Sequence, residues 1–194
     1  HLPLLSAAGR GLSVARGVTS RTEHAVKRAE RLASTLNASA GFAGVHEVVP
    51  LLELIASEAT RLLDCDRASI FVHDRERNEL VACPALGVEG GTLRIPDNAG
   101  IVGDVIHNGH PVQVDDVTTD DRFNADVDKE TGYTTRNLLC VPLRDGRGDV
   151  MGAFELINRL EGSFNEDDLE GLEHLAGQAA VALANTQEHQ RLLR

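Results

Sequence analysis

The stretch "RNLLCVPLRDGRGDVMGAFELINR", residues 136–159, decides the fold. Two apolar runs flank the short turn "GRG", and this arrangement is typical of an antiparallel β-hairpin. Side chains alternate between the two faces of a strand, so Phe154 and Leu156 point one way and Glu155 points the other. The sequence therefore predicts a sheet with one strongly apolar face and a second face that holds a carboxyl group.

A long helix is predicted downstream of this hairpin, over 165–190. Either Ser163 with Glu166 or Asn165 with Asp168 can cap its first turn. Apolar side chains recur along it at helical spacing and form its buried face. These are Leu169, Leu172, Leu175, Ala176, Ala179, Ala180 and Leu183.

Upstream of the hairpin, short runs bounded by turn residues predict further strands. They cover residues 67–74, 78–85, 92–95 and 111–116. A helix is expected over 47–63 with Pro50 in its first turn, where the missing N–H costs little. The segment 96–109 predicts a loop that enters a short helix, and 118–133 predicts a polar segment with one helical turn. The fold class is α+β: one antiparallel sheet of about six strands, with long helices on one face and short helices on the other.

Residues 18–40 predict a separate helix with a narrow stripe of small and apolar side chains at alternating spacings of four and three. The stripe consists of Val18, Thr22, Ala25, Ala29, Leu32, Leu36 and Ser39. It indicates a signalling or dimerisation helix, with an amphipathic helix that packs on its own domain as the alternative. Residues 1–17 are expected to be a disordered or vector-derived start, and 44–190 to be the main domain.

Composition and charge exclude several classes of partner. The 194 residues carry a net charge of −11, and residues 64–194 alone hold 25 acidic against 12 basic side chains. Such a surface argues against nucleic acid and anionic membranes. No apolar run is long enough to cross a bilayer. Three dispersed cysteines predict neither a disulfide framework nor a zinc site, so a cytoplasmic location is expected.

Catalytic and metal motifs are absent from the sequence. It contains no nucleophile elbow, phosphate-binding loop of the Walker type or zinc-protease motif. Asn124, Asp126 and Asp128 imitate the start of a calcium-binding loop, but Lys129 and Thr135 occupy the positions that need Gly and Glu. We expect no enzyme activity, no metal and no cofactor.

Two segments favour a site for a small polar ligand instead. In "AGIVGDVI", residues 99–106, Gly100 and Gly103 flank a helix start, where free N–H groups can hold an anion. The alternative for the glycines is a plain tight turn. In "DKETGYTTR", residues 128–136, the residues Asp128, Thr131 and Thr135 could serve base edges and ribose hydroxyls, with helix capping as the alternative.

With these residues in view, the sequence resembles a GAF domain of the cyclic-nucleotide-binding type found in phosphodiesterases and cyanobacterial adenylate cyclases. The resemblance covers about residues 46–190 and is strongest in "IPDNAGIVGDVIHNGHPVQVDDVTTDDRFNADVDKETGYTTRNLLCVPL", residues 95–143. It implies a pocket between the sheet and a lid of two short helices. The residues it implies as ligand contacts are Ser69, Ile101, Val102, Asp128, Thr131, Thr135 and Glu155.

The resemblance assigns roles to most of these contacts, and Asp128, Thr131 and Thr135 would serve the base and ribose from the lid. Ile101 and Val102 would bind the cyclic phosphate through their backbone N–H groups, and Glu155 would reach the ribose or base from the floor. The family's structural motif, which ties a strand to the last helix, falls on Asn158, Arg159, Phe164 and Asp168, with Leu169 in place of its final Glu. Ala85 and Leu86 replace an aromatic and an acidic residue that face the base in some relatives, which leaves cAMP or cGMP open.

The predicted function is a regulatory cyclic-nucleotide sensor that controls an effector outside this chain through its terminal helices, as a homodimer joined by those helices. The first alternative is a dimerisation spacer of the same fold with an empty or non-nucleotide pocket. A sensor for another small molecule or haem, and an enzyme of the sulfoxide reductase type, are less favoured, since the cysteines are not clustered for redox chemistry.

Overall fold

The computed structural model describes residues 48–83 and 93–192, apart from the side chains of 48, 49, 127, 130, 131 and 186–192. The helix predicted over 18–40 and the start at 1–17 lie outside the described residues. The order of elements is α2 (Val48–Leu62), β1 (Cys65–Asp74), β2 (Glu79–Cys83), β3 (Leu93–Pro96), α3 (Gly100–Asn108), β4 (Val112–Val114), η3 (Val117–Thr119), α4 (Ala125–Thr131), β5 (Leu138–Arg144), β6 (Val150–Arg159) and α5 (Glu166–Leu192).

One six-stranded sheet in the order β3-β2-β1-β6-β5-β4 forms the centre of the molecule. Every pair of neighbouring strands is antiparallel. The α+β fold predicted from the sequence is confirmed, and the ends of the described strands agree with the predicted ends within two residues. The two central strands, β1 and β6, have ten residues each.

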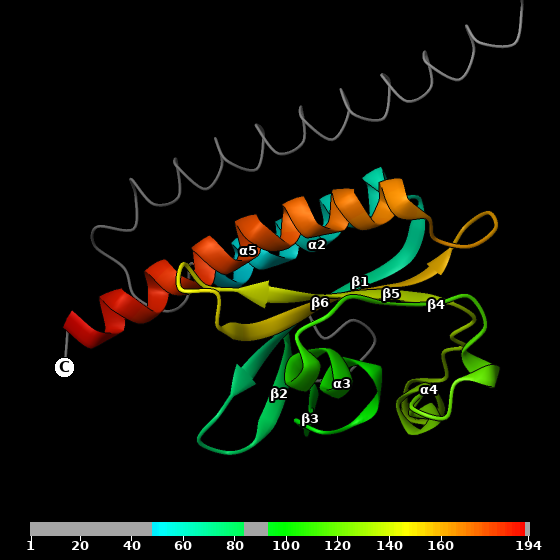
Figure 1. Cartoon of the computed structure of the whole chain (residues 1–194), viewed down its shortest axis with the longest axis horizontal. Coiled ribbons are helices and arrows are strands. Elements are labelled where there is room, and N and C mark those ends of the chain that lie inside the picture. Colours follow the sequence, from blue (N-terminus) through cyan, green and yellow to red (C-terminus); the bar gives the residue numbers. More distant parts are fainter. Residues whose placement is uncertain (1–47, 84–92, 193–194) are drawn as a thin grey trace, which may run out of the picture.

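The two long helices α2 and α5 lie together on one face of the sheet, and α3 and α4 lie on the other (Figure 1). Because α2 and α5 each bury one apolar face, they and the sheet enclose the larger core. Asn165 and Asp168 cap α5 reciprocally, each side chain accepting from the other residue's backbone N–H at 3.1 Å. This is one of the two caps that the sequence predicted.

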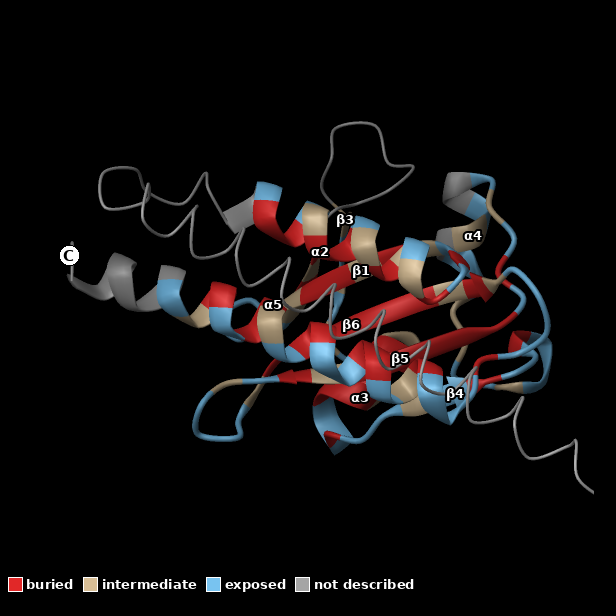
Figure 2. Cartoon of the chain, turned by 90° about the horizontal axis from the view of Figure 1, so that it is seen from above, coloured by how far each residue is buried: buried red, intermediate tan, exposed pale blue. Residues whose placement is uncertain are grey.

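A smaller core lies between the sheet and α3, and includes Phe71, Val105 and Ala153. The central strands are therefore buried from both sides, as the red strands in Figure 2 show. The β5–β6 hairpin carries Pro142, which lacks an N–H group. Pro142 lies beyond the part of β5 that pairs with β4, Leu138–Cys140, so β5 is an edge on that side, where proline is tolerated.

Gly103 fixes the approach to α3. A side chain there would place its Cβ 2.6 Å from the carbonyl carbon of Asn98, so only glycine lets the preceding loop pack on the helix. Gly103 thus has a structural role, although the alternative expected from the sequence was a tight turn. Within the described residues, no helix is long and apolar enough to cross a membrane.

Candidate functional site

A cavity of about 80 Å³ lies between the sheet and the helices α3 and α4. Most of its wall is apolar, and four side chains can offer polar groups to a ligand. Its polar lining consists of Asn124, Asp128, Thr135 and Glu155. The backbone at the start of α3, residues Gly100, Ile101 and Val102, completes one end of the wall.

Glu155 forms the floor of this cavity. It lies in β6 on the face that looks toward α3, as strand alternation predicted, and only 8% of its surface is exposed. No residue in the described part of the chain forms a hydrogen bond with its carboxyl group. Burial, and then the repulsion from Asp128, raise the pKa of Glu155 to about 7. A group of this kind can act as acceptor when ionised and as donor when protonated.

Asp128 and Thr135 meet at the end of α4. The Asp128 carboxylate accepts from the Thr135 N–H at 2.7 Å and from the Thr135 hydroxyl at 2.8 Å. The chain can turn back between them because Gly132 adopts a left-handed conformation with φ of 67°. The structure thus brings together two predicted contact residues, and their hydrogen bonds are with each other.

The start of α3 opens on the same cavity. Its N-cap residue Ala99 has no side chain that could accept a hydrogen bond from the first turn. Among the described residues nothing accepts from the N–H groups of Gly100, Ile101 or Val102, while the side chains of Ile101 and Val102 are buried. Free N–H groups and the helix dipole make this end of α3 attractive to an anion.

The structure does not place the predicted contacts Ser69 and Thr131 in the cavity lining. Ser69 is the register partner of Glu155 in the neighbouring strand β1 and is half-buried, but it is not part of the cavity lining. Thr131 ends α4, and its side chain lies outside what the structure describes. Ala85 and Leu86, the positions bearing on the choice of base, also lie outside the described residues.

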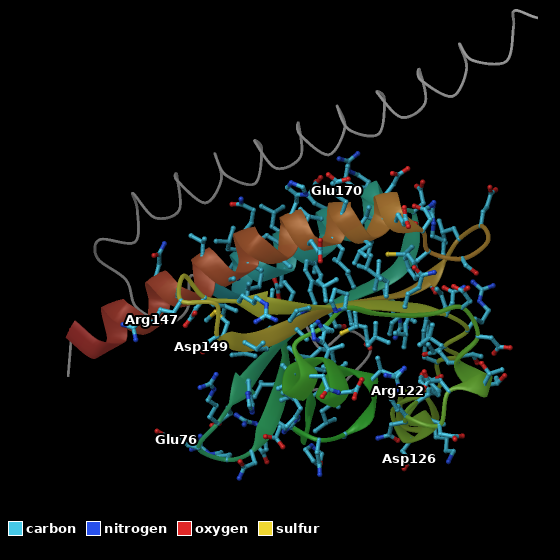
Figure 3. The ribbon with its side chains drawn as sticks, in the orientation of Figure 1. Glu76, Arg122, Asp126, Arg147, Asp149 and Glu170 are labelled. Atoms are coloured by element: carbon cyan, nitrogen blue, oxygen red, sulfur yellow. The ribbon has the colours of Figure 1, made fainter. Side chains whose placement is uncertain are left out.

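Sequence reasoning missed Phe123 and Asn124, which line the cavity from the loop before α4. Asn124 accepts from the N–H of Asp126 at 3.0 Å and so caps the helix. Phe123 is the single large apolar side chain in a polar segment, a signal that could have marked it as inward-facing. The loop is held to α3 by Arg122, which lies between α3 and α4 (Figure 3) and pairs with Asp104 at 2.7 Å.

The structural motif joins three elements beside the cavity. Asn158 accepts from the N–H of Arg136 at 2.7 Å and donates to the carbonyl of Thr134 at 2.9 Å. Arg159 Nε lies 3.0 Å from an Asp168 oxygen at the start of α5, as an ion pair without the alignment of a hydrogen bond. Its Nη1 donates to the carbonyl of Leu63, just after α2, at 2.9 Å. Phe164, also in the predicted motif, is buried in the larger core.

A second cluster, centred on Tyr133, was not predicted. The Tyr133 hydroxyl donates to Asp66 and accepts from the Asn158 side chain at 2.9 Å. The guanidinium of Arg67 lies 3.7 Å from the centre of the tyrosine ring. Burial, and then the hydrogen bond to Asp66, raise the pKa of Tyr133 to about 12. The cluster fixes the segment after α4 to the start of β1.

Among the described residues, no group of three or more His, Cys, Asp or Glu side chains could hold a metal ion. A shallow hollow of about 430 Å³ on the outer side of α3 contains Asp104, His107 and Arg122. Arg122 is already paired with Asp104 and with Asp120 there.

Comparisons with known proteins agree with the fold. A family model described as GAF domain matches residues 47–183. The "Dual 3',5'-cyclic-AMP and -GMP phosphodiesterase 11" of Drosophila melanogaster is 33% identical over 162 residues, which are 75% of this chain and 11% of that protein. The "Probable 3',5'-cyclic phosphodiesterase pde-5" of Caenorhabditis elegans is 30% identical over 164 residues, 77% of this chain and 22% of that protein.

Among solved structures, the GAF domain from an Acinetobacter phosphoenolpyruvate-protein phosphotransferase superposes with a TM-score of 0.68 at 17% identity. The match covers 88% of this chain and 97% of that one, and at this identity it bears on the fold alone. The chain spans about a tenth of the first phosphodiesterase and about a fifth of the second. The match therefore does not show that this chain has their enzymatic activity.

Proposed function

Because the chain belongs to the GAF domain family, we propose that it is a regulatory module whose cavity binds a cyclic nucleotide, cAMP or cGMP. Binding controls an effector outside this chain, and the module itself catalyses no reaction. The similarity to two cyclic-nucleotide phosphodiesterases supports this ligand class. A cytoplasmic location, suggested by three free cysteines, belongs to the same proposal.

One observation carries the proposal. Two sets of unpartnered polar groups open on a single, mostly apolar cavity: the N–H groups at the start of α3 and the carboxyl group of Glu155. A cyclic nucleotide combines an anion with hydroxyl and base donors, so it can satisfy both sets at once. In this arrangement Ile101 and Val102 bind the phosphate, and Glu155 binds the ribose or the base.

Binding has to open the cavity. Its volume of about 80 Å³ is below the roughly 300–1,000 Å³ that is usual for small-molecule sites. The element best placed to move is α4, a seven-residue helix whose end is held by the bonds between Asp128 and Thr135. A nucleotide that takes over these two side chains favours a different position of α4, and this differential affinity is what a regulatory ligand needs.

In this proposal, the effect on the effector runs through the long helices, within a homodimer that forms through α5 and the segment 18–40, for which the sequence predicts a helix. Val181, with 57% of its surface exposed, gives the outer side of α5 an apolar residue that a second copy can cover.

The second candidate function is a dimerisation spacer whose cavity binds no nucleotide. The small volume of the cavity and the mutual satisfaction of Asp128 and Thr135 favour it. The free N–H groups of α3 and the Glu155 carboxyl group, which forms no hydrogen bond within the described residues, favour the sensor, since a polar ligand can supply the partners that they lack.

Calorimetric titration of the purified chain with cAMP and with cGMP distinguishes the two. We expect one of them to bind with a dissociation constant of about 1 μM or tighter, near −8 kcal/mol. Thr131→Ala and Glu155→Ala should weaken binding without unfolding the domain, while Thr60→Ala on α2 should leave binding unchanged. Absence of binding by either nucleotide, with none co-purifying, would favour the spacer.

A further inference from the structure

Two carboxyl groups share the cavity, and only one of them accepts hydrogen bonds from the described residues. Asp128 accepts two hydrogen bonds from Thr135, at 2.7 and 2.8 Å. Glu155 lies on the floor, 92% of its surface is covered, and it accepts none from the described residues. Two like charges in one small cavity repel each other, so a proton that enters this cavity goes to Glu155.

The other groups around Glu155 do not neutralise it. On β5 its register partner Cys140 is a fully buried thiol, and burial raises the pKa of Cys140 well above its usual value, so the thiol stays neutral. On β1 the register partner is the neutral Ser69, and the nearby cation Arg67 lies over the Tyr133 ring. From α3 only backbone N–H groups reach the cavity, and no described cation lines it.

We propose that ligand binding at this cavity takes up a proton onto Glu155, so that affinity for an anionic ligand falls as the pH rises. This inference rests on the proposed function, because it takes the cyclic phosphate at the start of α3 as the anion. The step is the protonation of one carboxylate: solvent supplies H⁺, and the Glu155 carboxylate becomes a neutral carboxyl group that can donate as well as accept.

The sign follows from charge. A bound phosphate adds a second anion to a cavity that already contains the Asp128 carboxylate, and this makes an ionised Glu155 less favourable than before. The pKa of Glu155 is already raised to about 7 by burial and by Asp128. Binding therefore raises it further, and the complex holds up to one proton more than the free protein near neutral pH.

The test is calorimetric titration with cAMP and cGMP between about pH 6 and pH 8, in two buffers of different ionisation enthalpy. Cyclic nucleotides suit it because a phosphodiester lacks the second ionisation that a phosphomonoester has near pH 6. We expect roughly tenfold weaker binding at pH 8 than at pH 6 and uptake of up to one proton, since each whole proton taken up changes affinity about tenfold per pH unit.

Glu155→Gln mimics the neutral carboxyl group. Its affinity should no longer depend on pH, whereas Glu76→Gln, at the exposed β1–β2 turn (Figure 3), should behave as wild type. Nucleotide binding with an affinity that is constant from pH 6 to pH 8 and no proton uptake would overturn this inference and leave the proposed function intact. A pH dependence that persists in Glu155→Gln would also overturn it. If neither nucleotide binds at pH 6, both proposals fail.

Discussion

Glu155 links the stability of the domain to pH. Its folded-state pKa of about 7 exceeds the ordinary value of 4.5, so between these values the folded state holds a proton that the unfolded state has lost. Stability from this group is therefore present below about pH 4.5 and is lost as the pH rises to about 7. The shift corresponds to roughly 3 kcal/mol.

Chemical denaturation across this range, compared between wild type and Glu155→Gln, isolates the contribution. The variant should be more stable than wild type at pH 8, and the difference should shrink toward pH 5. Asp168 is also raised in pKa by burial and titrates in the same direction, so only the difference between the two proteins is informative. A difference that does not change with pH would contradict the placement of Glu155.

A second prediction for a single residue concerns Gly152 in β6. A Cβ at this position would lie 2.2 Å from the carbonyl oxygen of Phe71, which is backbone and cannot move aside. We expect Gly152→Ala to lower the free energy of unfolding by about 3 kcal/mol, in the range of overpacked cores. Gly177→Ala on α5 is the matched control. Its Cβ meets nothing within 4 Å, so it should be neutral or stabilise by up to about 1 kcal/mol.

At the scale of elements, the segment after α4 is held to the start of β1 by the Tyr133 hydroxyl, which bonds Asp66 and Asn158. Tyr133→Phe removes both bonds and should destabilise the domain by about 1 kcal/mol, because the site is partly exposed. A double-mutant cycle with Asp66→Asn measures the interaction free energy between the two side chains. Additive effects of the two substitutions would mean that this contact does not stabilise the segment.

Local patterns predicted most of these elements. The hairpin around 145–149, the Asn165–Asp168 cap and the face on which Glu155 lies depend on residues close in sequence, and all three were predicted. Two features were not predicted: the hydrogen bond of Tyr133 with Asp66 and the position of Phe123 in the cavity wall. Both join segments that are far apart in the chain, and the spacing of residues within one segment does not indicate such contacts. The small volume of the cavity is likewise a result of packing, and the residue types alone gave no sign of it.

At the scale of the whole molecule, contacts run from the cavity to both long helices. Asn158 binds the segment after α4, and its neighbour Arg159 contacts the carbonyl of Leu63 after α2 and Asp168 at the start of α5. If ligand binding shifts α4, as proposed above, these contacts connect the shift to α2 and α5. This arrangement supports regulation through the terminal helices, and a measured coupling between the two ends would establish it.

The measurement that tests the central claim most directly is a two-dimensional amide NMR titration with cAMP and with cGMP, following the N–H signals of Gly100, Ile101 and Val102. Hydrogen bonds from a cyclic phosphate to these free N–H groups should move the three signals more than those of the helix face formed by α2 and α5. Saturating ligand that leaves all three signals in place would contradict a phosphate site at the start of α3, and with it the proposed sensor.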